Sequence, residues 1–572
     1  MAVTSEGEPG LPTLSLSAYV AFATRSHGRA IAILVLVSLL AFLPGFFQIP
    51  PVDRDEARFA QATKQMIESG DYVDIRFQDE NRYKKPVGIY WLQAAVVKSA
   101  DALGVSDAHT TIWLYRIPSL LGAVGAVLLT YWAALAFVSR RAAVLAGLML
   151  AASILLGVEA RLAKTDAMLL STVVAAMGAL GRVYLANHGS HIQMAHRWTW
   201  PAIFWTAVAG GILLKGPLIL MFVALTAAAL SIIDRSARWL IGLKPIAGIF
   251  WLLLLVLPWF IAIIARSGDS FFAESIGNDL FAKVGAGQES HGAPPGLYFV
   301  LFWVTFWPGS MLVGLAAPAV WNVRREPGAK YLLAWIVPSW IVFEIVLTKL
   351  PHYVLPLYPP IAILAAGILD HQALSRRRWL EAGTVWWFII ATVLAVGMIA
   401  AHIALGEQLG LLAWPFAGGA IIFALFAWLL YRVDGAERSL LRAIAASLCV
   451  AFGVYATTFP AISELFPAVE LADYVHEANC YDPMVATAGY HEPSLVFLVG
   501  TDLRHTSGEG AAEFLSEGRC RFAFVESRQQ RAFAQAAESI GLRYSLGRRV
   551  EGFNISGGRR ISIAIFRAEG RQ

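Results

Sequence analysis

Long apolar runs limit what this chain can fold into more than any other feature of its sequence. They recur at lengths of about 18 to 22 residues, which fits helices that cross a hydrocarbon core about 30 Å thick. Charged residues make up only 15% of the 572 residues, against about a quarter in soluble domains. Because a soluble helical core does not need so many runs of this length, the sequence predicts an all-α polytopic membrane domain.

The apolar runs also predict how many times the chain crosses the membrane. The first run follows a polar N-terminus without a small-residue cleavage site, so we interpret it as a retained span. The whole set predicts about thirteen spans. The weakest part of the count is Lys215-Gly216-Pro217, where two neighbouring runs could form one broken helix. The spans are expected near 30–49, 112–137, 142–158, 166–186, 199–214, 216–233, 245–265, 297–318, 330–348, 353–370, 384–404, 411–431 and 439–459.

Basic residues gather in every second loop of this arrangement. Positively charged loops stay cytoplasmic, which predicts a cytoplasmic N-terminus and an extracytoplasmic C-terminal segment in a multi-pass protein of the bacterial cytoplasmic (inner) membrane. The net charge of +5 arises largely from these loops, so it reports topology rather than nucleic-acid binding. These loops carry Arg25 and Arg29; Arg140 and Arg141; Arg182 and Arg197; Arg235, Arg238 and Lys244; Arg324, Arg325 and Lys330; Arg376, Arg377 and Arg378; and Arg432, Arg438 and Arg442.

The opposite loops carry ionisable residues inside apolar and aromatic sequence. Any one of them could simply extend to the interface, but five such loops on one face favour a shared extracytoplasmic cavity, because charge at membrane depth is costly. The residues are Asp55 and Lys85; Arg161, Lys164 and Asp166; Lys215; Glu274, Asp279, Lys283 and His291; and Lys349 and His352.

The first outer loop, residues 52–91, has acids at one end and a basic cluster at the other. Asp53, Asp55 and Glu56 follow the first span, and Arg82 and Lys85 stand near the end of the loop. This arrangement suits transfer of a group from an anionic carrier. Between them, apolar residues at helical spacing predict an amphipathic helix over 56–69 on the membrane surface or against the span ends.

Residues 465–572 differ from the membrane domain, 1–464. Short apolar stretches at 484–488, 495–499, 521–525 and 561–566 alternate with helix-like segments at 510–517 and 529–540. This pattern predicts a small soluble α/β domain. Cys480 and Cys520 each precede a predicted strand, and an oxidising compartment permits a disulfide between them, although spacing alone does not establish proximity.

Several short motifs occur in order over roughly residues 30–370. They are Asp55-Glu56-Ala57-Arg58-Phe59-Ala60, Glu68-Ser69-Gly70-Asp71-Tyr72, Arg82-Tyr83-Lys84-Lys85-Pro86, Tyr90-Trp91, Ala163-Lys164-Thr165-Asp166, Leu214-Lys215-Gly216-Pro217 and Lys349-Leu350-Pro351-His352-Tyr353-Val354-Leu355-Pro356. Together they resemble the GT-C glycosyltransferases, in the branch that contains the lipid A aminoarabinose transferases and the protein O-mannosyltransferase-like enzymes, and the combination of motifs is specific.

The resemblance implies transfer of a sugar from a polyprenyl-phosphate donor to an envelope acceptor, most simply lipid A or a related glycan, outside the membrane. Asp55 and Asp166 are then the expected catalytic carboxylates of an inverting displacement. The expected donor-phosphate ligands are Arg82, Lys85, Lys215 and Lys349, since fixed cations stabilise developing charge. The cavity is expected to include Glu56, Arg58, Tyr83, His352 and Tyr353.

A divalent metal is a further implication of the family, but no cofactor is required. The aminoarabinose transferases carry an acid where this chain has Lys84, which removes one candidate ligand. Glu274 and His291 remain weak metal candidates, because two such residues do not define a site. No phosphate-binding glycine motif suggests a nucleotide donor.

Other interpretations of the same residues stay open. Asp55 could instead cap the helix over 56–69, Asp166 could be a first-turn acid of its span, and Glu56 is expected to face Arg58 or its own first turn. A transporter or flippase of a lipid-linked substrate is the alternative function, but it predicts an internal repeat and midplane charges, which the sequence does not display. A non-catalytic scaffold leaves the loop 52–91 unexplained. The sequence identifies neither the sugar nor the acceptor.

Overall fold

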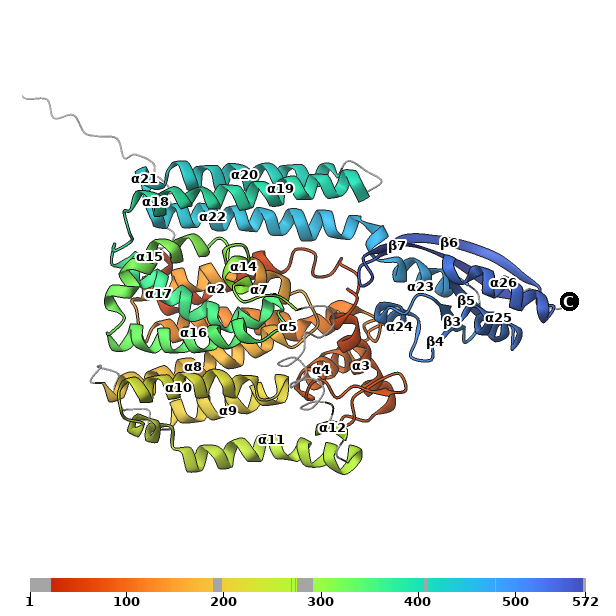
Figure 1. Cartoon of the computed structure of the whole chain (residues 1–572), viewed down its shortest axis with the longest axis horizontal. Helices are drawn as coiled ribbons and strands as arrows, with labels where there is room; N and C mark the ends of the chain where they lie inside the picture. The colour runs from red at the N-terminus through yellow and green to blue at the C-terminus, as the bar shows by residue number, and fades with distance from the viewer. Residues whose placement is uncertain are drawn as a thin grey trace, which may run out of the picture.

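A computed structural model describes residues 22–188, 198–268, 270–272, 274, 292–405, 410–478 and 480–568. Figure 1 shows a body of roughly aligned helices with a smaller unit of strands and helices beyond one end of it. Helices α3 (Asp55–Ser69) and α4 (Gly88–Ala102) lie between these two parts. The loop predicted to carry chemistry is therefore at the junction of the molecule.

The helical body is built from apolar helices in chain order. Its principal helices are α2 (His27–Phe42), α5 (Ile112–Ala134), α6 (Arg140–Ala151), α7 (Ile154–Glu159), α8 (Asp166–Asn187), α9 (Thr199–Lys215), α10 (Leu218–Ile233), α11 (Pro245–Ser267), α14 (Leu297–Thr305), α15 (Ser310–Val323), α16 (Pro327–Ile345), η4 (Pro351–Leu357), α17 (Tyr358–Asp370), α19 (Trp386–Leu405), α20 (Trp414–Leu429) and α22 (Ala436–Ala451).

The predicted count of about thirteen spans is only partly supported. Within the described ranges, eight helices are long and apolar enough to cross a membrane, or up to nine if the bent pair α14 and α15 is one span. That pair bends by 119°. The run expected at 142–158 is divided between α6 and α7, and the runs on either side of Lys215-Gly216-Pro217 form the separate helices α9 and α10. The break between α6 and α7 thus divides a run that the sequence prediction counts as one span, whereas the separation of α9 from α10 agrees with the two runs predicted there.

Close backbone contacts at two glycines bring the functional loops together. A Cβ on Gly122 of α5 would lie 2.6 Å from the Met168 nitrogen of α8, and a Cβ on Gly88 would lie 2.7 Å from the Leu213 oxygen of α9. Such approaches require a residue without a side chain. The first contact places the start of α8 against α5, and the second places the end of the basic loop beside the end of α9.

The C-terminal unit contains a five-stranded mixed sheet in the order β4-β3-β5-β7-β6. Strand β3 runs parallel to β4 and β5, whereas β7 runs antiparallel to β5 and β6. The elements are α23 (Pro467–Glu477), β3 (Met484–Ala488), α24 (Pro493–Val499), β4 (Arg504–Thr506), α25 (Gly508–Ser516), β5 (Arg521–Glu526), α26 (Gln530–Ser539), β6 (Tyr544–Asn554) and β7 (Arg559–Ala568).

Two details of this unit differ from the sequence prediction. The apolar stretch 495–499 is not a strand but part of helix α24, which begins at Pro493. A short apolar run fits either element, and its neighbours decide; here the run packs against α3. Strand β6 was missed because it is exposed over most of its first half and carries polar residues there, so it lacks an apolar signature.

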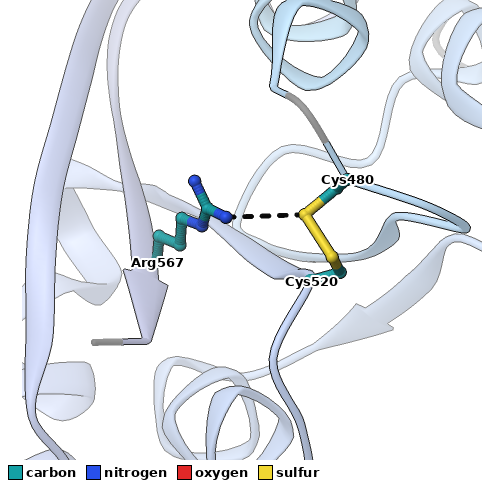
Figure 2. Close-up of a disulfide and its surroundings, with 3 residues drawn as sticks. All are labelled: Cys480, Cys520 and Arg567. Atoms are coloured by element: carbon teal, nitrogen blue, oxygen red, sulfur yellow. Dashed lines mark hydrogen bonds between the residues drawn. A yellow bond between two sulfur atoms is a disulfide. The ribbon is translucent and has the colours of Figure 1, made fainter. Parts of the chain in front are cut away.

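Cys480 and Cys520 form a disulfide with a Cα–Cα distance of 5.6 Å. Figure 2 shows the pair beside Arg567 of β7, whose Nη2 donates a hydrogen bond to Cys480 Sγ at 3.5 Å. The Met484 amide donates to the Cys520 carbonyl at 3.0 Å. The bond therefore joins the chain at the starts of the neighbouring strands β3 and β5.

We expect reduction of this disulfide to loosen the C-terminal unit. Closing a chain separation of 40 residues stabilises a fold by about 2–4 kcal/mol. In Cys480→Ser/Cys520→Ser protein, amide hydrogen exchange in β3 and β5 should accelerate, whereas Cys449→Ser serves as the matched control. Equal exchange rates in the double variant and the wild type would contradict this role.

Candidate active site

Five ionisable side chains meet near the start of α3, and we call them the ionisable cluster. Their side chains are at most 11% exposed. Buried charges are tolerated in proteins when they are paired. The members are Glu159 at the end of α7, Lys164 in the following loop, Asp166 at the start of α8, Lys215 at the end of α9 and His352 in η4.

Asp166 is the centre of the ionisable cluster. Its Oδ1 accepts a hydrogen bond from Lys215 Nζ, and its Oδ2 lies 3.7 Å from Lys164 Nζ. Lys164 also lies 3.0 Å from Glu159 Oε1. Two carboxylates and two ammonium groups therefore alternate in space, which offsets much of the cost of burying each of them.

The imidazole of His352 lies between the two carboxylates. Its Nδ1 is 3.8 Å from Glu159 Oε1, and its Nε2 is 3.7 Å from Asp166 Oδ1. Tyr353 completes this side, with its ring 5.0 Å from that of His352 and 5.4 Å from Lys215 Nζ. Asp166, Lys215, His352 and Tyr353 were all expected in one cavity, and the fold brings them together.

Glu159 is a member of the ionisable cluster that sequence reasoning missed. It closes an apolar run and is 2% exposed, and its Oε2 is a buried atom without a hydrogen-bond partner among the described residues. The sequence signal for Glu159 was its position as a single acid at the end of a predicted span, because ionisable groups at membrane depth are costly and are usually functional.

Asp55 is exposed at the first position of α3. It lies close enough to Lys164 of the ionisable cluster and to Tyr90 of α4 to interact electrostatically with both. The position before the helix belongs to Arg54, and no side chain makes a capping hydrogen bond there. The alternative that Asp55 serves as the helix cap is therefore wrong.

Glu56 forms the most deeply buried ion pair near the site. Its partner is Arg116 of α5, with Nε–Oε1 and Nη2–Oε2 distances of 2.8 Å each. The Val52 and Ala163 amides each donate to Glu56 at 2.9 Å. The partner of Glu56 is therefore Arg116 rather than the expected Arg58, and these four bonds engage both of its carboxylate oxygens.

Arg116 also bonds the chain that follows α2. Its Nη1 donates to the carbonyls of Phe46 at 3.1 Å and Ile49 at 2.7 Å, and its Nη2 donates to that of Pro50 at 3.0 Å. One side chain therefore fixes the chain entering the loop 52–91, while Glu56 fixes the loop that carries Lys164. The two loops that supply the predicted carboxylates are joined through this pair.

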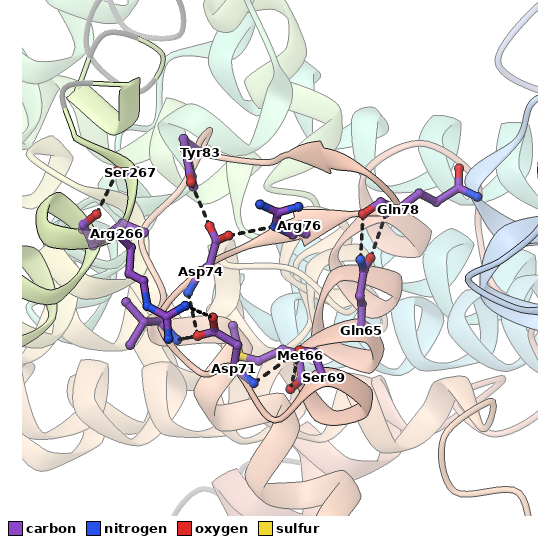
Figure 3. Close-up of polar contacts among 12 residues, drawn as sticks. Gln65, Met66, Ser69, Asp71, Asp74, Arg76, Gln78, Tyr83, Arg266 and Ser267 are labelled. Atoms are coloured by element: carbon purple, nitrogen blue, oxygen red, sulfur yellow. Dashed lines mark hydrogen bonds and ion pairs between the residues drawn. The ribbon is translucent and has the colours of Figure 1, made fainter.

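The basic end of the loop is held by the acids in its middle. Figure 3 shows Asp74 between Tyr83, whose hydroxyl donates to Oδ1 at 2.8 Å, and Arg76, whose Nε donates to Oδ2 at 2.8 Å. Burial and the bond to Asp74 raise the pKa of Tyr83 to about 12. Asp71 pairs with Arg266 of α11 at 3.0 Å. Tyr83 therefore supports the loop, through a phenol that stays protonated.

The predicted phosphate-binding cations are divided between three places. Lys215 lies in the ionisable cluster. Arg82 is 8% exposed over the Phe59 ring, and half-buried Lys85 donates to the Lys84 carbonyl at 2.9 Å. Lys349 instead donates to the carbonyls of Glu344 at 3.0 Å and Val346 at 2.5 Å, so it caps the end of α16.

Arg58, another residue expected in the cavity, interacts electrostatically with Asp53.

The two weak metal candidates were Glu274 and His291. Glu274 is described, but His291 lies outside the described residues. In the parts of the chain that the structure describes, no group of three or more His, Cys, Asp or Glu side chains could hold a metal ion.

Comparisons with known proteins find relatives in sequence and in fold. A family model described as dolichyl-phosphate-mannose-protein mannosyltransferase matches residues 32–269. Undecaprenyl phosphate-alpha-4-amino-4-deoxy-L-arabinose arabinosyl transferases are similar in sequence. That of Pseudomonas paraeruginosa is 27% identical over 60% of this chain and 60% of its own length. That of Yersinia pestis is 28% identical over 64% of this chain and 66% of its own length. The matches span less than two thirds of these relatives.

A solved structure shares the fold over nearly the whole chain. ArnT from Cupriavidus metallidurans bound to undecaprenyl phosphate superposes with a TM-score of 0.74 at 18% identity, covering 96% of this chain and 98% of that one. The protein thus has the fold of a GT-C membrane glycosyltransferase. Within that class, the chain resembles ArnT.

We expect Glu56→Ala to destabilise the protein rather than to remove a group from the chemistry. Breaking a buried ion pair leaves Arg116 without its countercharge, which costs about 3–5 kcal/mol. Thermal unfolding in detergent should shift far down for Glu56→Ala. Glu80→Ala, which removes an exposed acid of the same loop, should leave the unfolding temperature unchanged. If Glu56→Ala protein has normal stability but has lost transfer activity, the structural role is contradicted and Glu56 belongs among the substrate-contacting residues.

Proposed function

We propose that this protein is an integral-membrane glycosyltransferase that moves a sugar from a polyprenyl-phosphate donor to an envelope acceptor on the outer face of the bacterial cytoplasmic membrane. The observation that carries the proposal is the paired-charge ionisable cluster beside exposed Asp55, on the fold of ArnT. No feature of the described residues specifically favours the transporter or flippase alternative.

The reaction would be a single displacement at the anomeric carbon. An acceptor oxygen forms the new bond as the bond to the donor phosphate breaks, so negative charge grows on the departing polyprenyl phosphate. Lys215, Lys85 and Arg82 are the cations that would bind this phosphate, because charge-assisted hydrogen bonds to phosphate strengthen as its charge rises. Lys349 has a weaker claim, since it caps α16.

Asp55 would be the principal catalytic carboxylate, and its role depends on the acceptor. For a hydroxyl acceptor, it would take the proton that is lost as the bond forms. For a phosphate acceptor, which is already ionised, it would orient the acceptor or the sugar. Asp166 would act from within the cluster, where it holds Lys215 in position.

In this proposal the N-terminus is cytoplasmic, as the distribution of basic loops predicts. It keeps a membrane domain over 1–464, with about thirteen spans, and an extracytoplasmic α/β domain over 465–572. The disulfide supports an oxidising compartment for the second domain.

The similar arabinosyl transferases suggest 4-amino-4-deoxyarabinose as the first sugar to test, and lipid A or a related glycolipid as the first acceptor. Lys84 stands where those enzymes are expected to carry an acid, so hexose and uronic acid donors belong in the same panel.

The test is transfer by purified protein from a panel of polyprenyl-phosphate sugars to an envelope lipid extract. Asp55→Asn should lower kcat by roughly 100-fold or more, within the range for removing a general base, while unfolding at the wild-type temperature. Asp79→Asn is the matched control, because Asp79 is an exposed acid in the same loop. Transfer that persists in Asp55→Asn protein would contradict the assignment, and binding of polyprenyl phosphate without transfer of any sugar would contradict the proposed activity.

A further inference from the structure

The two residues directly before Asp55 are both attached to the C-terminal unit. Asp53 Oδ1 accepts a hydrogen bond from the Ser494 amide at 3.0 Å. Arg54 Nη2 donates to the Ser556 carbonyl at 2.9 Å. Ser494 lies in α24 and Ser556 lies in the turn between β6 and β7. The start of α3 is therefore attached at two points to parts of the chain more than 400 residues away.

The same unit also holds α3 along its length. Lys64 Nζ donates to the Phe497 carbonyl at 2.9 Å, and Gln61 Nε2 donates to Thr501 Oγ1 at 2.8 Å. Thr501 in turn donates to Glu68 Oε2 at 2.7 Å. Lys64 is 5% exposed, so this contact is a packed interface, and the helix that begins with Asp55 cannot shift independently of α24.

The backbone between the two attachments has an uncommon conformation. Arg54 has φ 71° and ψ −117°, a region that side chains with a Cβ rarely adopt. Such a conformation persists where the surroundings impose it, and it is found preferentially at functional sites. Here the bonds of Asp53 and Arg54 to the C-terminal unit are the contacts that can impose it.

The surroundings of Asp53 make one attachment sensitive to pH. Burial first, and then the nearby Glu492, raise the pKa of Asp53 to about 7, against the lowering effects of Ser494 and Arg58. Glu492 accepts from Ser556 Oγ at 2.8 Å, and Tyr490 also faces this carboxyl. Because attachment to the C-terminal unit raises the pKa of Asp53, attachment favours the protonated carboxyl. The attachment is strongest below the ordinary pKa of an aspartate and weakens as pH rises from there through about 7.

We infer that Asp53 and Arg54 are positioning residues, through which the C-terminal unit holds Asp55 toward the ionisable cluster. This inference rests on the proposed role of Asp55 and gives the C-terminal unit a part in the reaction. The unit supplies no reacting group. It fixes the conformation of the turn from which the carboxylate extends.

The first test removes the Arg54 attachment without straining the backbone. Glycine adopts positive φ readily, so Arg54→Gly keeps the turn accessible and loses only the side-chain bond. We expect its kcat to fall about 10- to 100-fold, the scale for misplacing a catalytic group by about 1 Å. The donor KM and the unfolding temperature should stay near the wild-type values, and Arg54→Lys should restore much of the loss. Unchanged kcat in Arg54→Gly protein would overturn the inference, and so would a loss that Arg54→Lys fails to restore.

The second test needs no sugar transfer, which separates it from the proposed function. Amide hydrogen exchange over residues 53–58, corrected for intrinsic rates, should accelerate as pH rises from 6 to 8 in the wild type, as expected for weakening by ionisation. Asp53→Asn should remove that acceleration, whereas the exposed control Asp502→Asn should retain it. Wild-type exchange that does not respond to pH, or that responds equally in Asp53→Asn, would overturn the inference. Wild-type protein that shows these exchange results without transferring any sugar would instead refute the proposed function.

Discussion

Arg116 and Glu56 form an ion pair that is almost completely excluded from solvent, and the end of the helical body that carries α3 is organised around it. A guanidinium offers several donors in a fixed plane, and here it reaches the chain after α2 as well as α3. The two carboxylate oxygens of Glu56 also receive amides from the loop 52–91 and from the loop that carries Lys164. Desolvation makes such a pair costly to break. The pair therefore holds together the two segments that carry Asp55 and Asp166.

The ionisable cluster also buries its charges in pairs, but its surroundings differ from those of the Glu56–Arg116 pair. Its lysines and carboxylates compensate one another, but they are flanked by His352 and lie within the electrostatic reach of exposed Asp55. In the proposed reaction, an incoming phosphate would exchange with a carboxylate for the lysine hydrogen bonds, because each ammonium has three donors. The pair of Glu56 and Arg116 has no comparable freedom, since backbone groups surround it. The proposal therefore gives the Glu56–Arg116 pair a supporting role and the ionisable cluster a binding role.

Much of this organisation could be predicted from the sequence. Asp166, Lys215 and His352 could be predicted as site residues because they are ionisable residues in apolar sequence. The motifs that contain them indicated the GT-C fold. The role of Lys349 could not be predicted, because the same motif position can either face a cavity or cap α16. Glu56 was misassigned for a similar reason: its partner Arg116 is 60 residues away and inside a predicted span. Helix α24 depended on tertiary contacts that decide between helix and strand for a short apolar run. Strand β6 could not be predicted because its first half is mostly exposed and carries no apolar pattern.

The central claim is that the departing phosphate binds beside the ionisable cluster, on the side that Asp55 faces. A cryo-electron-microscopy structure in a lipid nanodisc with bound undecaprenyl phosphate tests it most directly. The account predicts phosphate oxygens within about 3 Å of Lys215 or Lys85 Nζ, the distance of a charge-assisted hydrogen bond, with Asp55 across the same cavity. A phosphate at the opposite end of the helices, or one held by Lys349 alone, would contradict it.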